Sequence, residues 1–133
     1  MAKEAGIGWT TFSLDDSGGT LRAIVNDVTQ CNFDTPRAVQ DVTGLDKSAI
    51  ERLHLLADFS VSFTGVFNDA ASTGFHTVVK SLATIRTLTM VVSGQTLTNE
   101  VFLTSVNWSR AQSGELTGAV SGALGDGTVP VWS

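Results

Sequence analysis

The sequence predicts a mainly β fold: a small sandwich or barrel of antiparallel strands, with one short flanking α-helix and a long loop. The composition favours strands, because β-branched residues recur throughout and there are only two prolines. Residues 59–67 alternate without a break, with Phe59, Val61 and Phe63 on one side and Ser or Thr on the other. That period of two indicates a strand with one buried face. Short turn sequences rich in Gly, Ser and Asp separate the apolar runs.

Length, charge and cysteine content limit the classes of function. We expect residues 1–133 to form one domain, large enough to bury roughly two-thirds of its unfolded surface. The formal net charge of -5 argues against a surface that neutralises nucleic-acid phosphates. The single cysteine, Cys31, excludes an internal disulfide, and we interpret it as a small buried apolar residue rather than a nucleophile. Because no signal peptide or membrane-spanning run is found, we expect a soluble protein made in a cytoplasm.

The first third of the chain predicts three strands. Residues 1–8 have the composition of a flexible arm, and the runs 9–14 and 21–25 form a hairpin around the turn Asp15–Gly19. The carboxylates of this turn do not have the spacing of a calcium loop. Residues 28–34 form the third strand, with Thr29, Cys31 and Phe33 on one face, and Pro36 ends it.

Residues 38–57 are predicted to be an extended loop or a short helix. Asp46 is a suitable cap for a helix over Lys47–Leu56, with Ile50, Leu53 and His54 facing inwards. Such a helix would cover the sheet of its own subunit. Alternatively, the segment is a loop that completes an apolar core against another subunit.

The rest of the chain continues the β pattern after one helix. Gly65 interrupts the apolar face of the strand 59–67 where another backbone or a large ring could approach closely. Apolar residues at three–four spacing predict a helix over Thr73–Leu82, started by the pair Ser72–Thr73. Strands are expected at 85–92, 96–108 and 115–123, followed by a C-terminal arm at 125–133.

The strand 96–108 carries large apolar groups on both predicted faces and is therefore expected to be covered on both. On the alternating pattern, Val101 and Leu103 lie on one face, and Phe102, Val106 and Trp108 lie on the other.

Residue types and spacings that support catalysis are missing. His54 and His76 stand at no known triad or ligand spacing, and Asp15 and Asp16 would point apart on a strand. We therefore predict a protein that is not an enzyme and that has no metal and no cofactor. One alternative is a non-catalytic carbohydrate-binding β-sandwich module, in which Trp9, Trp108 and Trp132 would form the sugar platform.

Several whole segments resemble the major tail (tail tube) proteins of long-tailed bacteriophages. They are residues 24–33 (IVNDVTQCNF), 41–46 (DVTGLD), 56–67 (LADFSVSFTGVF), 113–120 (SGELTGAV) and 125–132 (GDGTVPVW). The resemblance implies a virion structural protein with a small β-sandwich or barrel and one flanking helix. Six copies would close a ring, inner strands would line a continuous tube, and rings would stack through the long loop and the chain ends.

The same resemblance implies the partners and the location. The chain would assemble with itself and with other tail proteins, namely the tape measure, the terminator and the baseplate. DNA would pass through the lumen without specific binding, and no membrane would be involved. The protein would be made in the cytoplasm of the bacterial host and would end in the tail of the virion.

Apolar side chains in excess of the predicted core mark a self-assembly interface. The strands already fill a small sandwich with eight residues: Phe59, Val61, Phe63, Leu88, Met90, Val101, Leu103 and Leu116. Apolar residues in 38–56 and in the C-terminal arm then require another partner. The predicted interface residues are Val39, Val42, Leu45, Ile50, Leu53, Leu55, Val129, Pro130, Val131 and Trp132. The excess of acidic residues further predicts a polar, neutral-to-acidic channel wall without a ring of Lys or Arg.

Overall fold

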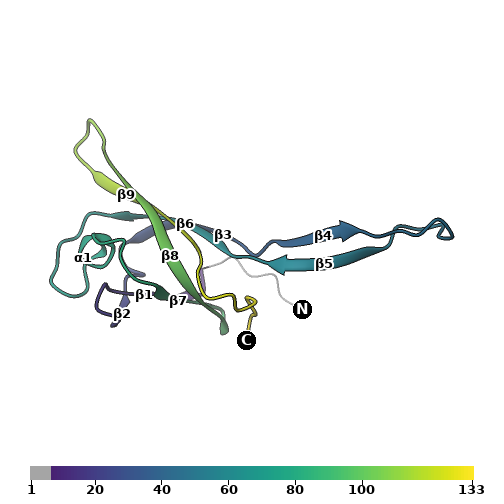
Figure 1. Cartoon of the computed structure of the whole chain (residues 1–133). Helices are drawn as coiled ribbons and strands as arrows, with labels where there is room; N and C mark the ends of the chain where they lie inside the picture. Colours follow the sequence, from purple (N-terminus) through teal and green to yellow (C-terminus); the bar gives the residue numbers. More distant parts are fainter. Residues whose placement is uncertain (1–6) are drawn as a thin grey trace.

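The computed structural model describes residues 7–133, so most of the predicted N-terminal arm, residues 1–8, lies outside the described part of the chain. Seven strands form one antiparallel sheet in the order β2-β1-β7-β8-β9-β6-β3 (Figure 1). They are β1 Trp9–Asp15, β2 Leu21–Ala23, β3 Val28–Asp34, β6 Ser60–Val66, β7 Arg86–Val92, β8 Gln95–Arg110 and β9 Leu116–Leu124. Two further strands, β4 Arg37–Asp41 and β5 Arg52–Ala57, form a separate two-stranded ribbon.

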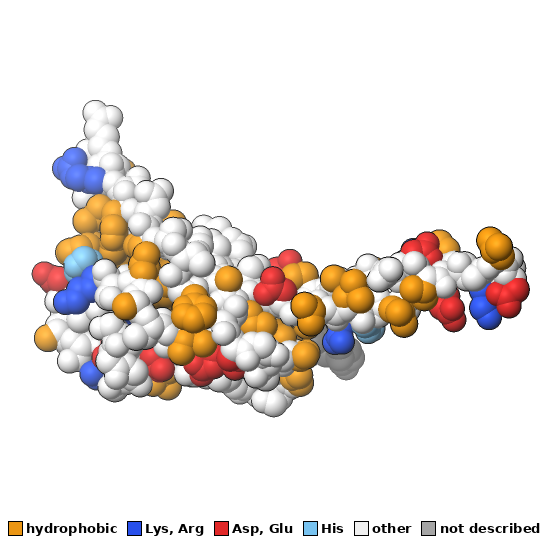
Figure 2. Space-filling view, viewed as in Figure 1, with side chains coloured by type: hydrophobic (Ala, Val, Ile, Leu, Met, Phe, Trp, Pro, Cys, Tyr) orange, Lys and Arg blue, Asp and Glu red, His pale blue; other side chains and the backbone are white. Residues whose placement is uncertain are grey.

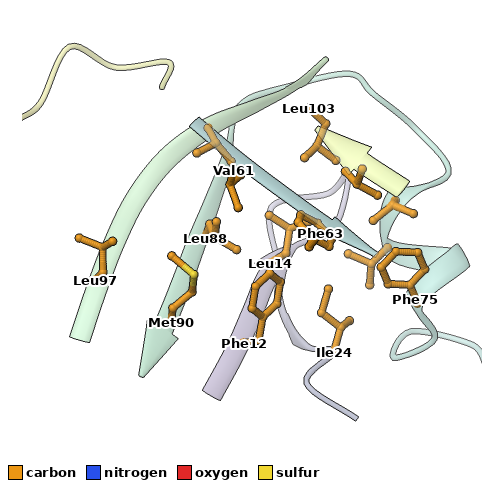
Figure 3. Packing of buried hydrophobic residues seen from close by; sticks show 14 of the residues in the cluster. Phe12, Leu14, Ile24, Val61, Phe63, Phe75, Leu88, Met90, Leu97 and Leu103 are labelled. Atoms are coloured by element: carbon orange, nitrogen blue, oxygen red, sulfur yellow. The ribbon is translucent and has the colours of Figure 1, made fainter. Parts of the chain in front are cut away.

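The large sheet curls around a single core. Three strands, β7, β8 and β9, lie between β1 and β6 in the sheet. Nevertheless, the ring centroids of Phe12 in β1 and Phe63 in β6 are 5.0 Å apart. Trp9 of β1 likewise lies 6.3 Å from Phe33 of β3. Such contacts between distant strands place the core on the inner face of the sheet, where Figure 3 shows the apolar side chains converging. The predicted class, an antiparallel sandwich or barrel with one short helix, is confirmed.

The core contains nearly all the residues expected from strand alternation. Every predicted core residue except Leu116 is buried. Leu116 pairs with Arg110 near the tip of the β8–β9 hairpin, which extends past the core, so it is only half-buried. The core also includes residues that the sequence pattern did not single out as core: Phe12, Leu14, Ile24, Phe75, Val78, Val79, Leu97 and Val120.

The helix α1 is shorter than predicted and spans Phe75–Val79. The backbone of Ser72 has a φ of 73°, in the left-handed region, so the helix cannot begin at the expected Ser72–Thr73 pair. Its N-cap is Gly74, without a capping side chain. Leu82 falls beyond the helix and is exposed rather than packed.

A buried carboxylate and a glycine hold α1 against the sheet. Asp27, 6% exposed, accepts hydrogen bonds from the Phe75 amide at 3.1 Å and from the Asn68 side chain at 3.2 and 3.1 Å. The Phe75 ring lies over Gly65, where a Cβ would come within 2.5 Å of the ring. The predicted close approach of a large ring at Gly65 is thus confirmed.

Two β-bulges change which residues face the core. The register of β8 on β9 shifts between Leu103 and Ser105, so Val106 and Trp108 return to the same inner face as Leu103. Only Phe102 lies on the outer face, and it is exposed, so the prediction of a strand covered on both faces was wrong.

A similar shift at the start of β3 affects the predicted face of that strand. The register of β3 on β6 is irregular between Val28 and Gln30. As a result Thr29 is exposed, whereas Cys31 and Phe33 pack against the core.

One fully buried cation fixes the loop between α1 and β7. The Arg86 guanidinium donates to the carbonyl oxygens of Val78 at 2.6 Å and Asp15 at 3.2 Å, and also to that of Ser81. Burial lowers the pKa of Arg86, an effect that the charges of Asp16 and Asp15 oppose. Carbonyl dipoles at the end of the helix therefore solvate this charge in place of water.

Candidate interaction surface

Residues 37–57 form a β-ribbon that projects away from the curled sheet, and we call this ribbon the arm (Figure 1). Val39 pairs with His54 and Asp41 pairs with Arg52 in antiparallel register. The helix predicted over Lys47–Leu56 is wrong, because residues 52–57 are the strand β5 and His54 is exposed. An amphipathic helix at this position would need a sheet to cover. In the ribbon, the backbone groups of β5 instead form hydrogen bonds with those of β4.

Short polar contacts order the outer part of the arm. The Asp41 carboxylate accepts hydrogen bonds from the Thr43 hydroxyl at 2.6 Å and the Thr43 amide at 3.0 Å. The Thr43 hydroxyl in turn accepts from the Glu51 amide at 2.8 Å. These two hydrogen bonds hold the pKa of Asp41 below its usual range, and the bond from the Thr43 hydroxyl has the larger effect. The arm is therefore ordered without apolar burial.

The apolar side chains of the arm lie in solvent. All five residues of β4 are exposed, and Leu45 at the tip is fully exposed. Figure 2 shows apolar side chains along the arm, interspersed with charged ones. The predicted interface residues Val39, Val42, Leu45, Ile50, Leu53 and Leu55 are all exposed there. Leu56 shares this surface and was not among the predicted residues; the adjacent leucines 55 and 56 place apolar groups on both faces of a strand.

The C-terminal residues lie apart from the tip of the arm and fold back on their own subunit. Thr96 and Ser133 exchange two backbone hydrogen bonds, at 2.8 and 2.9 Å, and Trp132 forms a bridge with Leu97. The Trp132 ring lies 5.9 Å from Phe33, near the end of the strand that leads into the arm. Val129, Val131 and Trp132 are nevertheless exposed, and Pro130 is half-buried.

A second surface, the outer face of the curled sheet, carries mainly small polar side chains, with Val66 and Phe102 among its exposed apolar residues. Register places Thr89 beside Thr98, and Ser62 between Asn32 and Ser121. The Thr87 hydroxyl donates to Glu100 at 2.5 Å. The basic residues of the described chain lie elsewhere, on β2, the arm, the helix end, the buried site of Arg86 and the hairpin tip: Arg22, Arg37, Lys47, Arg52, Lys80, Arg86 and Arg110. We call the outer face of the curled sheet the hydroxyl face.

The three tryptophans divide between two clusters. Trp9 and Trp132 both contact Phe33, whereas Trp108 packs against Phe67, Phe75 and His76. This separation does not favour a single sugar platform. Asp16 accepts from the amides of Gly18 and Thr20, in agreement with a role in the turn.

Other residues considered for chemistry have structural surroundings. Burial raises the pKa of the Cys31 thiol to about 11, so it stays protonated at neutral pH. Among residues 7–133, no three His, Cys, Asp or Glu side chains are grouped so that they could hold a metal ion. In the same part of the chain, no helix has the length and apolar character needed to span a membrane.

Comparison with known proteins defines the class of fold. No family model and no curated protein matches the sequence. Among solved structures, a chain from the tail of an empty gene transfer agent particle, refined with C6 symmetry, superimposes with a TM-score of 0.74 at 18% identity over 98% of both chains. A chain from the virion of a native gene transfer agent particle gives 0.72 at 15% identity over 99% of both. The chain therefore has the fold of a phage-like tail protein, as the resemblance in its sequence predicted.

Proposed function

We propose that this chain is a major tail tube subunit, which assembles with copies of itself into stacked rings, six to a ring, that form a channel for DNA. The observation that carries the proposal is the arm, because its apolar side chains have no partner within the subunit. The similarity to the gene transfer agent tail chain extends over 98% of the sequence, so the arm belongs to the shared fold.

Energetics favour burial of the arm in an assembly. Each large aliphatic side chain that leaves water contributes roughly 1.5–3 kcal/mol. Association costs an estimated 4–15 kcal/mol, so several such side chains buried together are needed to exceed it. The arm exposes seven large apolar residues, Leu56 included, and so supplies several such side chains. The neighbouring charges, Asp46, Lys47, Glu51 and Arg52, would set orientation and register more than affinity.

We further propose that the hydroxyl face lines the channel. Small hydroxyl and amide groups with Glu100 and Asp34, and without lysine or arginine, offer DNA phosphates no cation to bind. A ring of six chains would carry a formal charge of 6 × (-5) = -30, which opposes adhesion of DNA wherever it faces the bore. DNA would then pass without specific binding.

The wider setting follows from the same proposal. The tube would join other tail proteins at its two ends and along its bore, namely the terminator, the baseplate and the tape measure. The protein would be synthesised in the host cytoplasm and would act in the tail of the particle, as a structural component without catalytic activity.

Negative-stain electron microscopy and analytical ultracentrifugation of the purified chain test the assembly. We expect rings or tubes that the variant Leu53→Asp abolishes and the matched variant Leu53→Met retains. A wild-type protein that stays monomeric at high concentration, or Leu53→Asp tubes of normal length, would contradict the proposal.

The channel wall has its own test. Ser62→Lys would place six cations in each ring on the hydroxyl face, so its tubes should retain double-stranded DNA at low salt and release it as salt rises. Wild-type tubes should retain none. If Ser62→Lys tubes also retain none, the hydroxyl face is not the channel wall.

A further inference from the structure

The curled sheet does not close where its two ends meet. β2 pairs only with residues 13–15 of β1, so the first half of β1 has no strand on that side and faces β3 across a seam. A hollow of about 180 Å³ opens at this seam. Its walls are formed by Trp9, Phe12, Val25, Val28, Thr29, Gln30 and Cys31.

The seam hollow differs in chemistry from other hollows on the body. The hollow around Ser60, Ser62 and Ser121 contains the carboxylate of Asp34 beside Phe33 and Val61, and another contains Glu100 and Asp126. At the seam, two aromatic rings, two valines and a thiol supply most of the wall. Because burial keeps the Cys31 thiol neutral, no wall residue there carries a charge. The seam hollow therefore suits an aliphatic group.

The tip of the arm presents such a group. Leu45 follows Gly44 in the outermost turn, and its side chain is the most exposed of the large apolar residues in the described chain. The arm points away from the body that bears it (Figure 1), so Leu45 cannot reach the seam of its own subunit. An apolar cavity of about 150 Å³ accommodates benzene, so the seam hollow has room for the smaller isobutyl group of leucine.

We propose that Leu45 at the tip of the arm inserts into the seam hollow of a second copy of this chain. The contact rests on the proposed self-assembly and specifies one of its interfaces: a protruding side chain from one subunit and a hollow on the next. It is heterologous, because the two sides use different surfaces, and so it leaves a free arm at one end and a free hollow at the other. Such a contact propagates along a stack.

Cys31 reports on the occupancy of the hollow, because it is the only cysteine in the chain. Its rate of modification by a small thiol reagent would be compared in assembled and dissociated wild-type protein. Insertion of Leu45 should slow modification at least tenfold on assembly. Leu45→Asp places a charge at the tip of the arm, and the hollow has no opposite charge to pair with it. In this variant, Cys31 should be modified at the rate of the dissociated protein.

Two variants that each lose one side of the contact provide a stricter test. Val25→Trp would fill the hollow and leave the arm intact, whereas Leu45→Asp leaves the hollow intact. Each alone should form no stack, and their mixture should form a complex of twice the mass that cannot grow. Ala23→Trp, an exposed substitution outside the hollow, should assemble like wild type. Circular dichroism would confirm that each variant is folded.

The outcomes separate the two proposals. Wild-type protein that does not assemble overturns the proposed function and this contact with it. Tubes in which Cys31 remains equally reactive, or tubes formed by Val25→Trp, overturn the contact alone and leave the tube intact.

Discussion

The body and the arm of this chain use apolar residues in opposite ways. In the body, Phe12, Phe63 and Phe75 are at most 1% exposed and meet in edge-to-face contacts at 5.0 and 6.0 Å. In the arm, Leu53 is 55% exposed, although it too lies in a paired strand. Backbone pairing and polar turns are thus sufficient to shape the arm, while apolar packing stabilises the body. The arm is therefore a region whose stabilising partner lies outside the subunit.

The largest contrast should appear when each region loses one apolar side chain. Phe63→Ala removes a buried ring and should lower the free energy of unfolding by about 3–5 kcal/mol, the usual cost of such a cavity. Leu53→Asp should change it by less than about 0.5 kcal/mol, as for other surface sites, and yet abolish assembly. Urea unfolding followed by circular dichroism, with sedimentation, measures both. An unfolded Leu53→Asp would show that the arm contributes to the core of its own subunit.

Glycine substitutions sharpen the same comparison. A Cβ at Gly65 would lie 2.5 Å from the Phe75 ring, which packed neighbours hold in place, so Gly65→Ala should cost about 1–3 kcal/mol by overpacking. At Gly44 in the arm the nearest atom is the carboxylate oxygen of Asp46 at 2.9 Å, on a side chain free to move. Gly44→Ala should therefore leave the melting temperature unchanged. Equal losses at the two sites would remove the distinction between a packed and an open region.

Sequence patterns predicted the body better than the arm, for a physical reason. Alternation reports which face of a strand is buried in its own subunit, so Phe59, Val61 and Phe63 were assigned correctly. A bulge breaks that rule without a sequence signal, because one extra residue reverses the parity. Val106 and Trp108 were assigned to the wrong face for this reason.

The arm was ambiguous because its apolar residues are not patterned by burial within the chain. Leu53, Leu55 and Leu56 fit a helix that covers a sheet as well as they fit a ribbon that meets another molecule. The seam hollow could not be predicted, because it brings together Trp9, Val25 and Cys31 from separate strands and loops. The exposed apolar residues of the arm were predictable in another way. Once enough strand residues had been assigned to fill the core, the remaining apolar residues had no place in it.

The C-terminal residues are intermediate between the two regions. Deletion of residues 129–133 removes two backbone hydrogen bonds to Thr96 and the contact of Trp132 with Phe33. Since a hydrogen bond contributes a net 0.5–1.5 kcal/mol or so, and Trp132 is still 41% exposed, we expect a folded body about 1–2 kcal/mol less stable that no longer polymerises. Tubes of normal length from the truncated protein would exclude these residues from the interface.

The smallest effect concerns the pH dependence of the arm. Because the hydroxyl and amide of Thr43 bond to the ionised form of Asp41, the folded turn lowers the pKa of this carboxyl below its ordinary value of about 3.9. A carboxyl with a depressed folded-state pKa stabilises the turn above the ordinary value, and that contribution is lost as the pH falls through the depressed value. Acidification below about pH 4 should therefore loosen residues 41–51, while the body, whose core contains no part of this turn, stays folded. Amide chemical shifts of Thr43 and Glu51 should move together in that range and stay flat in Asp41→Asn, with amides of β6 and β9 as the internal control. A titration in which the β6 and β9 amides move with those of Thr43 would show that arm and body unfold as one unit.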